Sequence, residues 1–295
     1  MGSLDGKVAV ITGAGGGLGE THALLMAKEG AAIVVNDLGG ARDGSGASSS
    51  MADQVVEKIR AAGGKAVADY GNVANEADAK AMVQRAVDEF GKIDIMVANA
   101  GILRDKSFKN MTNEMWDIVI DVHLRGTYLT VKAAYDQMVE QGHGGSIVVT
   151  SSTSGLIGNF GQTNYGAAKA GIAGFARCLF QEGLKYGIRV NVLAPAAWSR
   201  LTADIFPQGQ NMEELLSPDK VSPIVAWLGT DEAREVTGRT FLAQGNAVTL
   251  LSWQAHSLAV KDNQEGPWDV SELGKSVLEN FDKWPKGPQP TPRQF

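Results

Sequence analysis

Short apolar runs alternate with longer helical segments along most of this 295-residue chain. The run at residues 7–12 (KVAVIT) is rich in β-branched residues and lacks polar alternation, which is typical of a strand buried on both faces. We expect strands at residues 7–12, 32–37, 66–69, 93–99, 146–151, 188–193 and 239–242, and helices at residues 18–29, 51–62, 76–90, 114–138, 164–186 and 221–228. This alternation predicts an α/β fold with a doubly wound parallel sheet, because helical crossovers join parallel strands.

The regular pattern ends near residue 245. We therefore expect one domain over residues 1–245 and a C-terminal extension over residues 246–295, with a helix at residues 269–281. The extension contains three of the tryptophans (Trp253, Trp268 and Trp284). We expect it to pack on the body or on a partner subunit, since large aromatic side chains are rarely left in water.

Composition narrows the classes of partner. Lysine plus arginine total 27 and aspartate plus glutamate total 33, so the formal net charge is −6. An acidic chain disfavours nucleic acids and anionic membranes, because both are bound through basic patches. The single cysteine, Cys178, excludes an internal disulfide, and the four histidines lack metal-ligand spacing, so no metal site is expected. No secretory signal or apolar stretch of membrane-spanning length is present in the sequence, so we expect a cytoplasmic location.

A glycine-rich turn at residues 12–19 (TGAGGGLG) follows the first strand and leads into a helix. Glycines let the backbone approach a pyrophosphate, and the helix N-terminus supplies free N–H groups. This placement is typical of a Rossmann-type dinucleotide site, with Gly13, Gly17, Leu18 and Gly19 expected at the cofactor.

Asp37 ends the second strand, 18 positions after Gly19. A carboxylate there can accept hydrogen bonds from both hydroxyls of the adenosine ribose, and it repels a 2′-phosphate. Arg42 is the nearest cation that could reach such a phosphate. The balance favours NAD over NADP.

Tyr165 and Lys169 lie four positions apart at the start of a predicted helix, so their side chains share one face. A free phenol has a pKa near 10, and a neighbouring ammonium group lowers it. Ser152 lies at the end of the fifth predicted strand and is placed to donate a hydrogen bond to a substrate oxygen. These three residues predict a proton-transfer site at the carboxyl edge of the sheet.

Over about residues 4–245 the chain resembles the short-chain dehydrogenase/reductase family. The motifs that carry this resemblance, in chain order, are residues 12–19, Asn99-Ala100-Gly101, Ser152 and Tyr165-x-x-x-Lys169, with a weaker match at residues 191–195. The resemblance implies that Tyr165 is the general acid/base, that Lys169 lowers its pKa and binds the nicotinamide ribose, and that Ser152 positions the reacting oxygen. It also implies a cofactor held by Asn72, Val73, Asn99, Ala100, Gly101 and Pro195 together with Tyr165 and Lys169.

Three positions depart from the family pattern. His123 stands where the family often has an asparagine of a catalytic tetrad, Asn72 where an aspartate is usual, and Ala196 where a glycine is usual. At His123 two interpretations stay open: the side chain holds a water of a proton relay, or it only fills space.

Several segments are similar to one subgroup, the (3R)-hydroxyacyl-CoA dehydrogenase domain of the peroxisomal multifunctional enzyme type 2. They are residues 36–40 (NDLGG), 100–105 (AGILRD), 122–126 (VHLRG) and 158–162 (GNFGQ). The resemblance implies an NAD-dependent oxidoreductase that interconverts (3R)-hydroxyacyl-CoA and 3-ketoacyl-CoA. It also implies a homodimer or homotetramer.

Two alternative functions are considered. One is a dehydrogenase of 17β-hydroxysteroids or of another bulky apolar secondary alcohol, which an apolar lid at residues 196–220 would also suit. Trp198, Leu201, Ile205, Phe206 and Met212 are the apolar residues expected in this lid. The other is a non-catalytic nucleotide-binding scaffold on the same fold. The intact set of Ser152, Tyr165 and Lys169 favours an enzyme over the scaffold.

Overall fold

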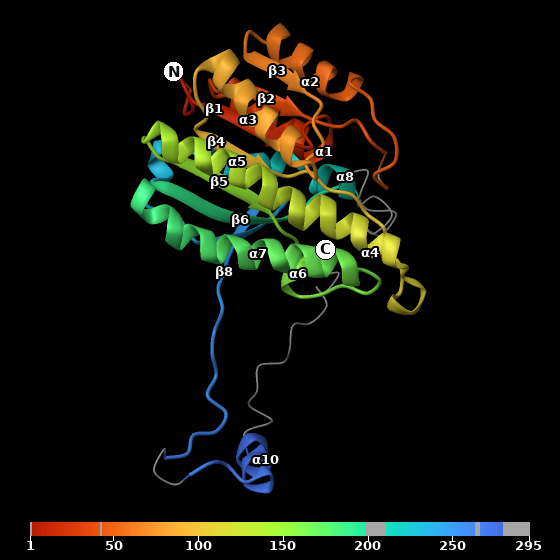
Figure 1. The fold of residues 1–295 in the computed structure, drawn as a ribbon, viewed down its shortest axis with the longest axis vertical. Helices are drawn as coiled ribbons and strands as arrows, with labels where there is room; N and C mark the ends of the chain where they lie inside the picture. Colours follow the sequence, from red (N-terminus) through yellow and green to blue (C-terminus); the bar gives the residue numbers. More distant parts are fainter. Residues whose placement is uncertain (1, 42, 199–210, 263–265, 280–295) are drawn as a thin grey trace. The chain divides into compact units, whose positions relative to one another are not determined.

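The computed structural model describes residues 2–41, 43–198, 211–262 and 266–279. In this part of the chain one eight-stranded sheet has the order β3-β2-β1-β4-β5-β6-β7-β8 (Figure 1). Its strands are β1 (Val8–Thr12), β2 (Ala32–Asn36), β3 (Lys65–Asp69), β4 (Ile95–Ala98), β5 (Gly145–Thr150), β6 (Ile188–Ala196), β7 (Thr240–Gln244) and β8 (Ala247–Leu251). Neighbouring strands are parallel except for β7 and β8. The predicted doubly wound α/β sheet is therefore confirmed, and the direction of winding reverses between β1 and β4, where such sheets bind ligands.

Helices cover both faces of the sheet (Figure 1). The longer ones are α1 (Gly17–Lys28), α2 (Ser50–Ala61), α3 (Glu76–Phe90), α4 (Asn113–Ile120), α5 (Gly126–Gln141), α7 (Thr163–Gly183) and α9 (Ser222–Gly229). Shorter helical segments are α6 (Thr153–Leu156), α8 (Met212–Leu215), η1 (Phe108–Asn110), η2 (Asp121–Arg125), η3 (Leu184–Tyr186), η4 (Pro218–Lys220) and η5 (Asp231–Ala233). Among the described residues, no helix combines the length and the apolar character needed to cross a membrane.

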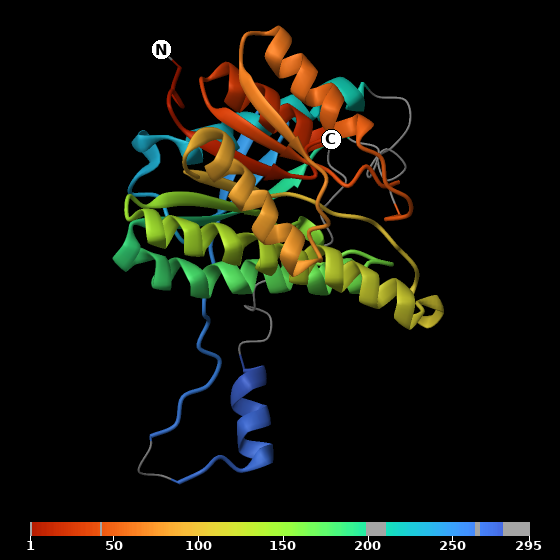
Figure 2. The same ribbon diagram turned by 45° about the horizontal axis from the view of Figure 1, so that its top comes forward.

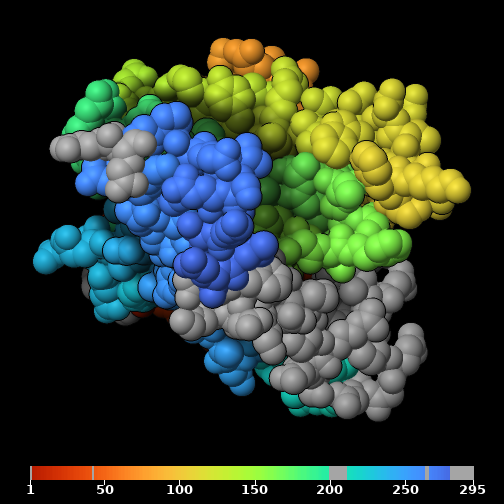
Figure 3. Space-filling model, turned by 90° about the horizontal axis from the view of Figure 1, so that it is seen from below, coloured from red at the N-terminus to blue at the C-terminus, as the bar shows by residue number. Residues whose placement is uncertain are grey.

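Two hydrophobic cores lie on opposite faces of the sheet. Ile11 and Val97 enter the core that α1, α2 and α9 cover, whereas Val10 and Met96 enter the core that α3, α5 and α7 cover. Every residue of β1, β2 and β4 is buried, as expected for strands with helices on both sides. Figure 2 shows α3, α5 and α7 along one face, and in Figure 3 the surfaces of α4 (yellow) and α7 (green) lie side by side.

The helix predicted at residues 114–138 is not continuous. A π-helical segment, η2, interrupts it between α4 and α5, so the chain makes one wide turn at residues 121–125. Hydrophobic spacing cannot reveal such a turn, because apolar residues on both sides of it still recur every three or four positions.

The sheet continues beyond residue 245, where the sequence suggested that the domain ends. Gly245 has a φ of +52°, and the chain turns there so that β8 pairs antiparallel with β7. The first compact unit accordingly ends at Leu251. The alternation of short strands with crossover helices did not predict β8, since a hairpin strand has no crossover helix before it.

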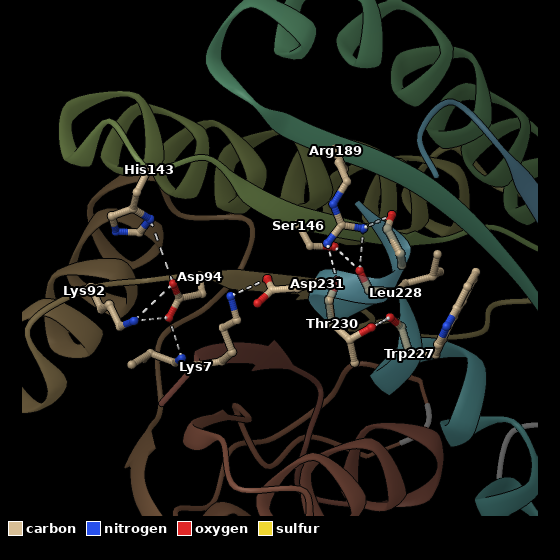
Figure 4. Close-up of polar contacts among 12 residues, drawn as sticks. Lys7, Lys92, Asp94, His143, Ser146, Arg189, Trp227, Leu228, Thr230 and Asp231 are labelled. Atoms are coloured by element: carbon tan, nitrogen blue, oxygen red, sulfur yellow. Dashed lines mark hydrogen bonds and ion pairs between the residues drawn. The ribbon is translucent and has the colours of Figure 1, made fainter. Parts of the chain in front are cut away.

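Polar side chains fix the amino ends of the central strands (Figure 4). Asp94 accepts a hydrogen bond from the Val8 backbone at 2.8 Å, which ties the segment before β4 to β1. Arg189 donates to the Leu228 carbonyl at 2.7 Å and to the Ala233 carbonyl at 3.0 Å, so it satisfies carbonyls at and beyond the end of α9. This edge is the one opposite to the carboxyl ends of the strands, and it holds α9 against the sheet.

A second compact unit begins at Ser252. Its helix α10 (Val270–Leu278) begins with a capping box between Asp269 and Glu272, within the helix predicted at residues 269–281. Lys261 pairs with Glu272 at 2.8 Å, and its ammonium group lies 5.2 Å from the centre of the Trp268 ring. Trp284 lies outside the described residues, and the packing of this extension on the body or on a partner stays a prediction.

Candidate active site

A cavity of about 350 Å³ opens at the carboxyl ends of the strands. It collects residues from the ends of β1, β2, β4, β5 and β6. The sequence-predicted residues that line it are Gly13, Gly17, Leu18, Asp37, Asn72, Val73, Asn99, Ala100, Gly101, Ser152, Tyr165, Lys169 and Pro195. Gly19 does not line the cavity. A Cβ on Gly19 would lie 2.1 Å from the Gly13 carbonyl oxygen, so this glycine lets α1 pack closely on the turn.

The glycine-rich turn and Asp37 form one hydrogen-bonded unit. One oxygen of the Asp37 carboxylate accepts from the Gly15 N–H at 2.8 Å, and the other accepts from the Gly39 N–H at 2.7 Å. Gly13 has a φ of +65°, a conformation that favours glycine, and α1 begins just beyond it with no side-chain cap on its first N–H groups. These free N–H groups and the bare backbone fit the pyrophosphate of a dinucleotide, with Asp37 beside the adenosine ribose.

Asn99, just after β4, stabilises the glycine-rich turn through hydrogen bonds. Its side-chain nitrogen donates to the carbonyls of Thr12 at 3.0 Å and Gly13 at 3.3 Å, while its backbone N–H donates to the Thr12 hydroxyl. The sequence resemblance assigned Asn99 to the cofactor, and the structure shows that its amide nitrogen bonds to the turn. Asn72 likewise accepts from the Ala74 N–H, and its own backbone N–H donates to Asp78, which shapes the loop before α3.

Ser152, Tyr165 and Lys169 meet in the cavity. Ser152 caps α6 by accepting from the Ser154 N–H at 3.2 Å, and Lys169 donates to the Thr150 carbonyl at 2.6 Å. The Lys169 nitrogen lies 5.5 Å from the centre of the Tyr165 ring. The fold thus places a phenol, a hydroxyl and an amine around one space, which is a set of groups that can move a proton to or from a substrate oxygen.

The electrostatics of this group differ from the expectation that Lys169 lowers the pKa of Tyr165. Desolvation raises the pKa of Tyr165 to about 12, although a hydrogen bond with Ser152 opposes the rise. Burial also lowers the pKa of Lys169 to about 7, so near neutral pH the amine is protonated only in part. Spacing alone suggested an ammonium–phenolate pair, whereas in this cavity burial favours the neutral form of both groups.

Sequence reasoning missed a polar network next to these residues. Gln162 donates to Asp105 at 2.7 Å and accepts from the Ser154 hydroxyl at 2.7 Å and from Asn159 at 3.0 Å. The Asp105 carboxylate adds to the rise in the pKa of Tyr165. The signal available was the segment GNFGQ immediately before α7, which had suggested a resemblance but no role for its amides.

His123 is also part of the cavity lining. Its Nε2 lies 2.7 Å from the Ile102 carbonyl oxygen and 3.0 Å from the Ile102 nitrogen. The ring is perpendicular to that of Tyr165, with 5.1 Å between the ring centres.

Only part of the predicted lid is described. The Trp198 N–H donates to the Leu216 carbonyl, and Met212 is buried. Leu201, Ile205 and Phe206, together with Arg42 of the loop after β2, lie outside the described residues. In the described ranges, no three His, Cys, Asp or Glu side chains are grouped as a metal site would need.

Comparisons with known proteins agree with this geometry. The family model described as short chain dehydrogenase matches residues 7–205. The peroxisomal multifunctional enzyme type 2 of Mus musculus is 45% identical over 279 residues, which cover 95% of this chain and 36% of that protein. A hydroxyacyl-CoA dehydrogenase of Mycobacterium tuberculosis is 40% identical over 94% of this chain and 89% of its own length. The crystal structure of a short chain dehydrogenase from Mycobacterium avium matches with a TM-score of 0.84 and 41% identity, covering 97% of this chain and 98% of that one. The chain thus spans about a third of the mouse enzyme, but nearly the whole of the two mycobacterial proteins.

Proposed function

The chain belongs to the short chain dehydrogenase family, and from this premise we propose that it is an NAD-dependent dehydrogenase that interconverts (3R)-hydroxyacyl-CoA and 3-ketoacyl-CoA. The match to the family confirms the resemblance inferred from the sequence. It makes the chain an oxidoreductase that acts on CH–OH groups and uses NAD or NADP. The choice of NAD and the substrate are our proposal. The observation that carries it is the meeting of Ser152, Tyr165 and Lys169 with the glycine-rich turn in one cavity.

The choice of NAD rests on the Asp37 carboxylate. It lines the cavity and is fixed by the N–H groups of Gly15 and Gly39, so it cannot easily turn away from a ligand. A 2′-phosphate on the adenosine ribose would meet this negative charge, whereas a free hydroxyl can donate to it.

The choice of an acyl-CoA rests on two kinds of support. A relative of matching length is named as a hydroxyacyl-CoA dehydrogenase, and the cavity has an apolar side formed by Ile102, Leu103, Ile118 and Val122. Such a side accepts the acyl chain next to the reacting carbon.

The chemistry divides between cofactor and chain. Bound NAD supplies the acceptor for the hydride of the alcohol carbon. Ser152 donates a hydrogen bond to the substrate oxygen, and the phenolate form of Tyr165 takes the alcohol proton as the carbonyl forms, which leaves a neutral tyrosine. Because burial raises the pKa of Tyr165 to about 12, the neutral tyrosine is the resting form, so oxidation of the alcohol requires Tyr165 to lose its proton first, whereas the reverse reaction starts from the proton donor.

The test is a turnover panel. NAD and NADP are each combined with (3R)- and (3S)-hydroxyacyl-CoA of several chain lengths and with 17β-hydroxysteroids, and the formation of NADH or NADPH is followed. We expect the highest kcat/KM with NAD and a (3R)-hydroxyacyl-CoA. A higher kcat/KM with the steroids would replace the proposed substrate, and no turnover of any acyl-CoA would refute it.

The variant Tyr165→Phe tests the assignment of the acid/base in the same assay. It removes only the hydroxyl, so we expect kcat to fall at least about 100-fold while NADH still binds. Tyr186→Phe is a suitable control, because Tyr186 lies in η3, just before the amino end of β6, at the edge of the sheet opposite to the cavity. Activity of Tyr165→Phe equal to that of the control would show that another group moves the proton.

A further inference from the structure

The π-helical segment η2 (Asp121–Arg125) brings a histidine into the wall of the active-site cavity. His123 lies in the middle of this segment and is 2% exposed. A π turn contains one more residue than an α-helical turn, and such turns are frequent at functional sites. The sequence left two interpretations of His123 open, a water-holding relay residue and a space filler, and the contacts that the side chain makes support a third.

The first contact is with the main chain after β4. The His123 Nε2 lies 2.7 Å from the Ile102 carbonyl oxygen, a distance at which an unprotonated nitrogen would repel the oxygen lone pairs. The Ile102 N–H also donates towards Nε2, at 3.0 Å, which needs an unprotonated nitrogen. Nε2 therefore meets both main-chain groups of Ile102, and each tautomer of the neutral ring bonds to one of them. The other nitrogen, Nδ1, has no partner among the residues that the structure describes.

The second contact is with the catalytic tyrosine. The rings of His123 and Tyr165 are perpendicular, with centres 5.1 Å apart, which is a favoured arrangement of aromatic pairs. Gly101 packs directly against the imidazole ring, and only a residue without a side chain fits there, since a Cβ at this position would lie 2.3 Å from the His123 Cε1 atom. The imidazole is thus held between the backbone at residues 101–102 and the Tyr165 ring.

The surroundings of His123 keep its imidazole ring neutral. Desolvation, together with the positive charge of Lys169, lowers the pKa of His123 to about 3. Tyr165 is the other titratable neighbour, and it is neutral as well. At physiological pH the imidazole therefore does not take up a proton.

We propose that His123 is a positioning residue, whose neutral ring fixes the Tyr165 ring and the Ile102 main chain for proton transfer without carrying a proton itself. This inference rests on the proposed function, because it takes Tyr165 as the acid/base.

His123→Phe, His123→Gln and His22→Phe form a matched set of variants. Phenylalanine keeps a ring but loses the bond to Ile102, and glutamine keeps a donor that can reach the Ile102 carbonyl. His22 is the control, because it is also fully buried with a pKa lowered to about 3, but it bonds to Ser222 between α1 and α9. All variants are checked for folding by thermal unfolding and for NADH affinity by fluorescence titration.

We expect His123→Phe to lower kcat about tenfold or more, since small misplacements of a reacting group are costly. His123→Gln should recover part of this loss, and NADH affinity should stay within about twofold of wild type, as expected when only the reacting geometry is disturbed. The pH profile of kcat should keep its shape in both variants. His22→Phe should lower thermal stability and leave kcat unchanged. A wild-type kcat in His123→Phe, or the loss of an ionisation from its pH profile, would overturn the proposal.

Gly101→Ala gives a second test that leaves the imidazole in place. The added methyl group should displace the ring and lower kcat, but the same change should have little further effect in a His123→Ala background. Additive losses would mean that the two residues do not act through one ring, which contradicts the proposal. The two failures can be told apart. If the wild-type protein itself turns over no alcohol, the proposed function is wrong; if only the variants behave otherwise than expected, the role of His123 is wrong.

Discussion

Replacement of Asp37 by serine should relax the preference for NAD. The Asp37 carboxylate is held by backbone N–H groups at 2.8 Å and 2.7 Å, and the residue is 8% exposed, so its charge stays at the cavity wall. Two unit charges about 4 Å apart interact with about 4 kcal/mol at an effective dielectric constant of about 20. The cavity is open to solvent on one side, so we take about half of this value, about 2 kcal/mol.

An energy of about 2 kcal/mol corresponds to a change of about 30-fold in the ratio of kcat/KM for NAD to that for NADP. The assay measures this ratio in wild type, in Asp37→Ser and in Asp136→Ser. The last variant loses the same net charge from the exposed face of α5, where Asp136 pairs with Lys132. An unchanged ratio in Asp37→Ser, or an equal change in the control, would refute the assignment of Asp37 as the discriminating group.

Two further predictions concern stability. Burial lowers the pKa of Lys169 from 10.5 to about 7, so between these pH values the unfolded chain binds a proton that the folded chain does not, and the free energy of unfolding should rise with pH. In urea unfolding at pH 7 and pH 9, Lys169→Met should remove up to about 2 to 3 kcal/mol of this rise, and an identical pH dependence in wild type and variant would contradict the lowered pKa. Arg189→Ala should lower the free energy of unfolding by about 3 kcal/mol, because it removes charged hydrogen bonds to the Leu228 and Ala233 carbonyls, and should leave kcat/KM unchanged. Lys7→Ala is the control, because it breaks an ion pair with the largely exposed Asp231 and should lower the free energy of unfolding by less than about 1 kcal/mol. An equal loss of stability in both variants would mean that Arg189 does not hold the end of α9.

Much of the fold could be predicted from local patterns. The parallel strands and crossover helices follow from runs such as residues 7–12, since a strand buried on both faces needs continuous apolar residues. Strand β8 could not be predicted in this way, because it lies at the edge and most of its residues are exposed. The interruption at η2 was also missed, since an extra residue in one turn shifts the hydrophobic spacing by a single position and leaves the spacing on each side unchanged.

The candidate site shows the same division. Glycine spacing and the Tyr165–Lys169 pair placed the proposed cofactor and proton-transfer residues around one cavity. The direction of their pKa shifts was not predictable, because desolvation depends on how many atoms from distant segments surround each group. The contact between Gln162 and Asp105 was equally hidden, since 57 positions separate them in the sequence.

The wide turn between α4 and α5 has a consequence for insertions and deletions in this helix. One residue of an α-helix corresponds to a rotation of about 100° and a rise of about 1.5 Å. The wide turn takes up its additional residue within a single turn of helix, so deleting one residue within residues 121–125 would let α4, η2 and α5 (Asn113–Gln141) join as one regular helix with α4 and α5 near their present orientations. Deleting one residue within α5 itself would instead rotate the side chains on one side of the gap by about 100°, and part of the buried face of α5 would turn away from the sheet. The wide turn is therefore the place where this helix can lose a residue with the least disturbance to its packing, although the loss would shift His123 in the cavity wall.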